Sequence, residues 1–162
     1  MIIRGEYYLL PHDVEISKLF ATGLSKTEIN RVLNQTVGKL IVFLDTCHAG
    51  GAQGRAVKGG AQADINGVVN ELAKAGRGAV VFASSTGNQV SVELEQYRHG
   101  AFTTALLDGL AGQADYTRDG VISTDELSLY ISDRVKKLTN GDQMPVTGKP
   151  DTTPDLRLFV VP

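Results

Sequence analysis

Apolar positions in this chain fall into short unbroken runs and into longer stretches with helical spacing. Residues 40–44 (LIVFL) and 78–83 (GAVVFA) are runs of branched, aromatic and small side chains, which are typical of strands buried on both faces of a parallel sheet. Residues 6–10 (EYYLL) form another strand pattern, which Pro11 ends. We expect the strand at 40–44 to be central in the sheet.

Four stretches have the spacing of amphipathic helices. Ser25 with Glu28 three residues later is a capping box, and it predicts a helix that runs to about residue 36. The inner face of this helix is expected to carry Ile29, Val32 and Leu33. Further helices are predicted at residues 65–75, 101–110 and 125–138, and a last strand at 156–161. Strands that alternate with helices predict an α/β layered domain with a mostly parallel sheet.

The bulk composition narrows the class of protein. A chain of 162 residues without an internal repeat is expected to form a single domain over residues 1–162. Its formal net charge of −2 argues against a nucleic-acid or membrane-surface partner. No stretch approaches the ~20 apolar residues that span a bilayer, and the first residues lack the features of a signal peptide. Because there is one cysteine, no intrachain disulfide is possible, and a reducing, cytoplasmic location is expected.

That cysteine lies just beyond the run at 40–44. The polar segment Asp45-Thr46-Cys47-His48 stops the run, and a glycine-rich stretch follows. Open α/β sheets bind ligands at the carboxyl ends of their strands, and a lone cysteine there is a candidate nucleophile. Cysteine is also a common apolar filler of cores, but a filler needs neither the polar neighbours nor the loop. We therefore interpret Cys47 as a catalytic nucleophile at an accessible sheet edge.

Several segments carry motifs that occur together in one known family. LDTCHAG (44–50) contains Asp-x-Cys-His followed by Ala-Gly, and EYYLLPHD (6–13), VFASS (81–85), HGAFTTALLDGL (99–110) and DGVIS with a following EL (119–127) lie around it. Together they resemble caspase-like cysteine peptidases, in the metacaspase and bacterial caspase-homologue branch. Those proteins usually carry Asp-x-Cys-His-Ser-Gly, so Ala49 is a mild departure. The resemblance spans nearly the whole chain in the family's order. It implies a caspase-like three-layer α/β/α fold with a mostly parallel sheet, lacking the first strands of the complete fold.

The resemblance also implies cysteine-type endopeptidase activity on a protein or peptide substrate. The Cys47 thiolate would attack a peptide carbonyl, and a histidine would act first as base and then as acid. This dyad chemistry needs no metal and no cofactor. The family's histidine belongs to a His-Gly pair at the end of an earlier strand, about 50 residues before the cysteine. Here only 46 residues precede Cys47, and they begin almost at the tyrosine-rich strand.

None of the three histidines present fits the role of base. His48 is next to Cys47, and neighbouring side chains on an extended segment point in opposite directions. His99 follows a polar stretch and matches the start of the GxFT helix, and His12 lies in a turn. Three explanations stay open: a fragment, which we favour, a subunit of a processed enzyme, or an inactive caspase-fold interaction module. In the first two, a preceding segment or a partner subunit supplies the histidine, and the chain alone has negligible activity.

Asp45 predicts the specificity. It lies two residues before the nucleophile, so its side chain shares the same side of the extended segment. The resemblance implies that Asp at this position accompanies cleavage after Arg or Lys, because a carboxylate binds a guanidinium through paired hydrogen bonds. Ser84 and Ser85 are expected to line the same pocket. Both could instead be simple turn residues, as could Asp45. The Gly-rich loop holds Arg55 and Lys58, where such an enzyme could cut itself, although an ordinary solvated loop is the interpretation that we favour.

Residues 115–126 allow another interpretation. The side chains at EF-hand loop positions 1, 3, 5, 6, 8 and 12 are Asp115, Thr117, Asp119, Gly120, Ile122 and Glu126. Oxygen ligands at this spacing could bind calcium, although Thr117 is a weak ligand and only one loop is present. Asp119-Gly120 also fits a plain turn, with Ser123 or Thr124 capping the next helix. A calcium-binding domain is therefore an alternative function.

Overall fold

The computed structural model describes residues 2–3, 6–45, 65–74, 78–84 and 100–161. The chain starts with a small antiparallel sheet of strands β1 (Ile2–Ile3), β2 (Glu6–Leu9) and β3 (Leu24–Ser25), in the order β1-β2-β3. A short 3₁₀ turn (Ile16–Lys18) and helix α1 (Leu19–Thr22) connect β2 to β3. The predicted strand at 6–10 is confirmed, and it pairs in this separate sheet.

Helix α2 (Lys26–Gln35) begins at the predicted capping box. Glu28 N–H donates to Ser25 Oγ (3.1 Å), and Ser25 N–H donates to Glu28 Oε2 (3.0 Å). Leu33 is buried and Ile29 packs against the same core, but Val32 is 57% exposed, so its predicted inward position is wrong. The helix contacts the core along one i, i+4 row, and Val32 is rotated roughly 100° from Leu33 about the helix axis.

The central sheet contains β4 (Leu40–Leu44), β5 (Ala79–Ala83) and β7 (Val146–Gly148), in the order β4-β5-β7. β4 and β5 are parallel, with Leu40 opposite Ala79 and Leu44 opposite Ala83. β7 runs antiparallel to β5, so the sheet is mixed. The parallel pairing was predicted, whereas the three-residue β7 carries no recognisable sequence pattern.

β4 differs from its predicted burial. All five residues of β5 are buried, but β4 is only partly buried and Phe43 is 39% exposed. The cause lies in the strand order: among the described residues, β4 pairs with β5 alone and forms the edge of the sheet. It was expected to be central.

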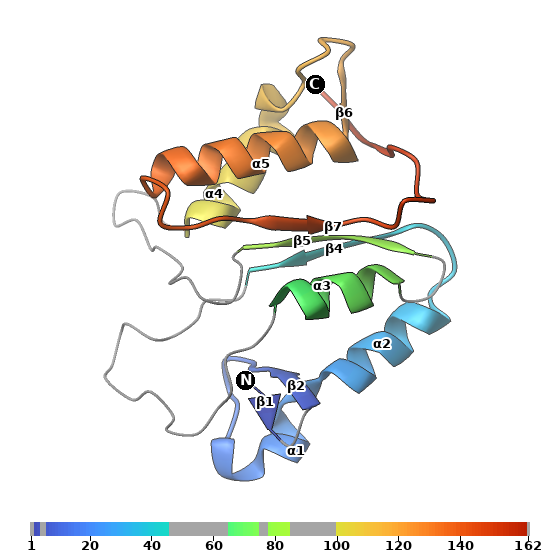
Figure 1. Cartoon of the computed structure of the whole chain (residues 1–162), viewed down its shortest axis with the longest axis vertical. Coiled ribbons are helices and arrows are strands. Elements are labelled where there is room, and N and C mark those ends of the chain that lie inside the picture. The colour runs from blue at the N-terminus through green and yellow to red at the C-terminus, as the bar shows by residue number, and fades with distance from the viewer. Residues whose placement is uncertain (1, 4–5, 46–64, 75–77, 85–99, 162) are drawn as a thin grey trace.

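Helices cover both faces of this sheet, which gives three layers (Figure 1). Alternate side chains of β5 point to opposite faces. Val81 packs in a core with α3 (Ile65–Lys74), and Phe82 packs in a second core with α4 (Ala101–Asp108) and α5 (Thr124–Leu138). The predicted α/β architecture is therefore confirmed.

Beyond α4 the chain forms one π-helical turn (Gly109–Gln113) and strand β6 (Val121–Ser123). β6 pairs antiparallel with the last strand, β8 (Arg157–Val160), in a ribbon separate from the central sheet. The strand expected at 156–161 is thus present, but β6 was not predicted.

Arg134 of α5 donates through Nε and Nη2 to Asp108 Oδ2 (3.1 and 3.0 Å), which ties α5 to the end of α4.

At Gly148 the backbone of β7 comes close to α3. A Cβ atom at this position would collide with the side chain of Val69 and lie 3.2 Å from its carbonyl oxygen. The backbone of β7 therefore packs directly on the helix.

Among the described residues, no helix combines the length and apolar character needed to cross a membrane.

Candidate active site

The carboxyl ends of β4 and β5 lie at one edge of the central sheet. The two strands are parallel and in register up to Leu44 and Ala83. Ser84 N–H donates to Leu44 O (2.9 Å), which extends the pairing by one residue. Asp45 and Ser84, two residues predicted to bind substrate, therefore follow adjacent strands at the same edge. Both strands end on the left-hand side of Figure 1.

Asp45 is exposed at this edge, and a helix from the other half of the chain reaches it. Thr103, in the first turn of α4, donates from Oγ1 to Asp45 Oδ2 at 2.6 Å. Among the described residues, no other side chain is hydrogen-bonded to this carboxylate. The turn-acceptor interpretation of Asp45 is therefore incomplete, because its partner is a helix 58 residues away.

Ser84 lies at the expected edge but is fully buried. Its carbonyl oxygen accepts a hydrogen bond from Gln143 Nε2 at 2.7 Å, and Gln143 is itself only 1% exposed. Gln143 N–H donates to Thr139 Oγ1 (3.1 Å), which orients the turn after α5. Two segments distant in sequence thus hold the ends of β4 and β5. The role of Ser84 in substrate binding stays a prediction.

Several predicted residues lie outside the described part of the chain. They are Cys47, His48, Arg55, Lys58, Ser85 and His99. His12 is described, and it is exposed in the turn after β2. Cys47 as nucleophile and self-cleavage at Arg55 or Lys58 therefore stay predictions; N-terminal sequencing of the ageing protein tests the latter.

Sequence reasoning missed Thr103 and Gln143. Thr103 is inside the motif GAFTT, which marks the start of a helix but gives no sign of a contact with Asp45. Gln143 follows Asn140-Gly141, which reads only as a turn. Pairs 58 and 59 residues apart leave no periodicity in a single sequence.

In the loop predicted as a possible calcium site, two carboxylates accept hydrogen bonds from backbone N–H groups of the same segment. Asp115 accepts hydrogen bonds from Asp119 N–H (3.2 Å) and Gly120 N–H (3.0 Å). Glu126 accepts from Thr117 N–H at Oε1 (2.9 Å) and from Ser123 N–H at Oε2 (3.0 Å). Partial burial acts to raise the pKa of Glu126, but these hydrogen bonds outweigh it and hold the pKa below its ordinary value.

Among the described residues, no group of three or more His, Cys, Asp or Glu side chains is arranged to hold a metal ion. Both Glu126 oxygens are engaged, so calcium would have to share or replace these bonds. Calcium binding stays a prediction. Titration calorimetry on the wild type and on Glu126→Ala tests it: heat that depends on Glu126 would support a site, and its absence would contradict one.

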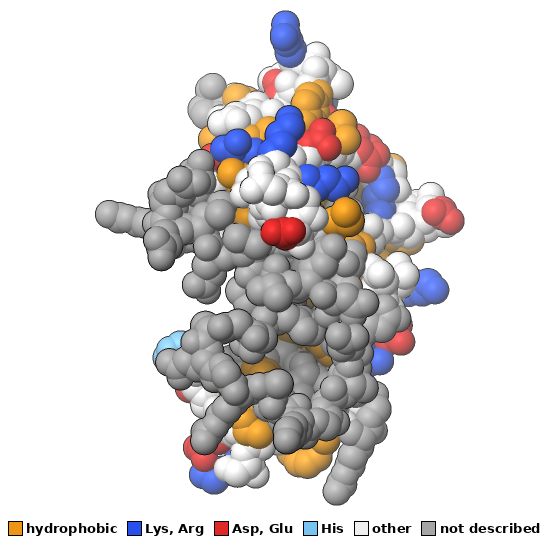
Figure 2. All heavy atoms as spheres, turned by 60° about the vertical axis from the view of Figure 1, so that its left-hand side comes forward, with side chains coloured by type: hydrophobic (Ala, Val, Ile, Leu, Met, Phe, Trp, Pro, Cys, Tyr) orange, Lys and Arg blue, Asp and Glu red, His pale blue; other side chains and the backbone are white. Residues whose placement is uncertain are grey.

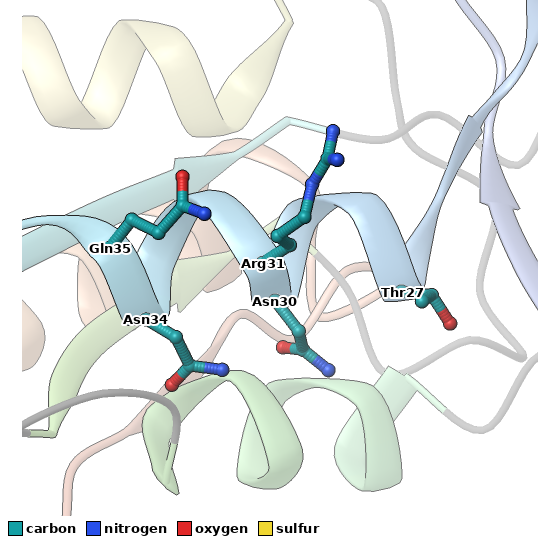
Figure 3. A pocket seen from close by; sticks show the side chains of 5 residues that line it. All are labelled: Thr27, Asn30, Arg31, Asn34 and Gln35. Carbon is teal, nitrogen blue, oxygen red and sulfur yellow. The ribbon is translucent and has the colours of Figure 1, made fainter.

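Two hollows lie away from the carboxyl edge. One, of about 530 Å³, lies along α2 and is lined by Thr27, Asn30, Arg31, Asn34 and Gln35. Asn30 and Asn34 point toward α3, and Arg31 and Gln35 point away from it (Figure 3). The other includes Lys39 and Gly78, which precede β4 and β5. In the described part of the face seen in Figure 2, basic and acidic side chains are interspersed in the upper half.

The layers and the parallel pairing of β4 and β5 define this chain as a three-layer α/β domain, and the segment DTCHAG follows β4 in the sequence. A family model described as the caspase domain matches residues 2–156. The chain therefore belongs to the caspase domain family, a family of cysteine peptidases. No curated protein matches the chain, and neither does any solved structure.

Proposed function

We propose that this chain carries the nucleophile of a cysteine endopeptidase that cleaves after Arg or Lys, in the metacaspase branch of the family. The observation that carries the proposal is the caspase-domain match over residues 2–156, with the segment DTCHAG directly after the parallel strand β4. The exposed carboxylate of Asp45 at the same edge supports the preference for basic side chains.

In this reaction the Cys47 thiolate attacks the carbonyl carbon of the scissile peptide bond. The backbone N–H of Cys47 helps to bind the oxyanion. A histidine imidazolium then gives its proton to the leaving amine, and the acyl-enzyme forms. Water, deprotonated by the same imidazole, hydrolyses the thioester and restores the thiol.

We propose that the histidine comes from a strand that pairs with the free edge of β4. Among the described residues β4 has one neighbour, and its apolar side chains are less covered than those of β5. An added parallel strand would end at the same edge as β4, and its last residues would lie beside Asp45. The strand would belong to a preceding segment or to a partner subunit.

Turnover of peptides that end in Arg, Lys, Asp or a neutral residue tests the proposal. We expect negligible activity from the chain alone and Cys47-dependent cleavage after Arg or Lys once the histidine-bearing strand is supplied. Cys47→Ala should abolish cleavage, and Asp45→Asn should remove the basic preference. A preference for Asp-ended substrates would contradict the specificity. No turnover with the strand supplied would favour an inactive interaction module.

A further inference from the structure

The hydrogen bond between Thr103 and Asp45 joins two elements that meet at the proposed specificity pocket. Its length of 2.6 Å lies in the range of charge-assisted bonds from a hydroxyl to a carboxylate. Thr103 is the third residue of α4. The N-cap of this helix is Gly100, which has no side chain that could accept a hydrogen bond from the first turn. The partial positive charge at the start of the helix also attracts a carboxylate.

An exposed aspartate at the end of a strand would otherwise rotate about two side-chain bonds. Binding a substrate cation would then include the entropic cost of fixing that rotation. Thr103 fixes the carboxylate through Oδ2 before any substrate arrives. Oδ1 accepts no hydrogen bond from any of the described residues, so none of them competes with a substrate for it.

We propose that Thr103 is a positioning residue for the pocket that receives the basic side chain. Its hydroxyl orients Asp45 so that Oδ1 can pair with a guanidinium or ammonium group of the substrate. This inference rests on the proposed function, since it names a residue that acts on substrate affinity through Asp45. A purely structural tie between α4 and the sheet would change stability without changing the choice of ligand.

The chain offers a matched control one residue away. Thr104 is also in α4 and is buried, but no partner for its Oγ1 exists among the described residues. Thr103→Val and Thr104→Val each replace a hydroxyl with a methyl group and keep a β-branched side chain in the helix. Thr103→Ser keeps the hydroxyl that Asp45 needs.

The test measures binding by calorimetry in a Cys47→Ala background, which prevents cleavage. The ligands are an acetylated tripeptide amide ending in arginine and the same peptide ending in citrulline, a neutral analogue of similar shape. We expect the arginine peptide to bind more tightly than the citrulline peptide. Thr103→Val should weaken arginine binding roughly 2- to 10-fold and leave citrulline binding unchanged. Thr103→Ser should restore it, and Thr104→Val should have no effect.

Each outcome decides a different point. Arginine preference that survives in Thr103→Val but is lost in Asp45→Asn would overturn the role of Thr103 and leave the proposed function standing. Equal binding of both peptides by the parent protein would overturn the basic specificity and this inference together. Arginine preference that depends on Thr103, in a protein that shows no Cys47-dependent turnover even with the histidine-bearing strand supplied, would support the inference and count against the peptidase proposal.

Discussion

Gln143 is a buried amide that links the turn after α5 to the end of β5. Its Nε2 donates to the Ser84 carbonyl, and it is 1% exposed. We expect Gln143→Leu to lower the free energy of unfolding by about 1–3 kcal/mol, because a buried carbonyl loses this donor. Urea unfolding measures the change. Gln35→Leu on the exposed side of α2 is the control, and an equal effect of both substitutions would contradict the argument.

At Thr104, in contrast to Gln143, we expect removal of the polar group not to lower the free energy of unfolding. Its hydroxyl oxygen is buried without a partner among the described residues, so the folded state bears a desolvation cost. We expect Thr104→Val to leave the unfolding free energy unchanged or to raise it by up to about 1 kcal/mol. Thr103→Val should lower it. Thermal unfolding of the two variants compares them directly, and a clear loss of stability in Thr104→Val would show that its hydroxyl has a partner.

Among the elements, α5 depends on the capping box formed by Ser123 and Glu126. The pKa of Glu126 is held below its ordinary value of 4.5, so the ionised carboxylate stabilises the folded state. That contribution is fully present above about pH 4.5 and decreases as the pH falls through the lowered pKa. We expect unfolding midpoints between pH 5 and 3 to decrease more steeply in the wild type than in Glu126→Gln.

Equal slopes in the two proteins would contradict this assignment. Asp151→Asn is a suitable control, because Asp151 is an exposed carboxylate with no side-chain hydrogen bond among the described residues. Its slope should match that of the wild type.

The success of the sequence predictions depended on how local each signal is. The capping box at Ser25 and the run that forms β5 are complete within a few residues, and both were found. β6 and β7 have three residues each, too few for a period to show. At the candidate site, the position of Asp45 could be predicted because it follows a recognisable strand, whereas its contact with Thr103 depends on how distant segments pack. The role of Asp45 in substrate binding stays a prediction.

For the whole molecule, the informative feature is the edge of β4 that pairs with no other strand in the described part of the chain. Its residue Phe43 stacks on Phe82 (ring centres 5.0 Å apart) but stays 39% exposed, so the α4 and α5 layer covers this strand incompletely. In a strand with one neighbour, every other backbone N–H points away from that neighbour. We therefore expect alternate amides of Leu40–Leu44 to exchange quickly with solvent in the isolated chain.

Hydrogen exchange followed by NMR measures this pattern. All five amides should become protected when the histidine-bearing strand is supplied. The part of β5 that pairs with both β4 and β7, Val81–Ala83, provides the internal reference, with uniform protection in both states. Uniform protection of β4 in the isolated chain would mean that another part of the chain already covers its edge.

Gly148 has a consequence that reaches the site. Since no space remains between β7 and Val69, a single methyl group at position 148 would act as a wedge between the sheet and α3. Either the Val69 side chain or the strand would have to shift to relieve it. Gln143 precedes that strand by a few residues, so we expect a shift of β7 to weaken the hydrogen bond from its amide to the Ser84 carbonyl. The close contact between Gly148 and Val69 is therefore expected to affect how firmly Gln143 anchors the end of β5.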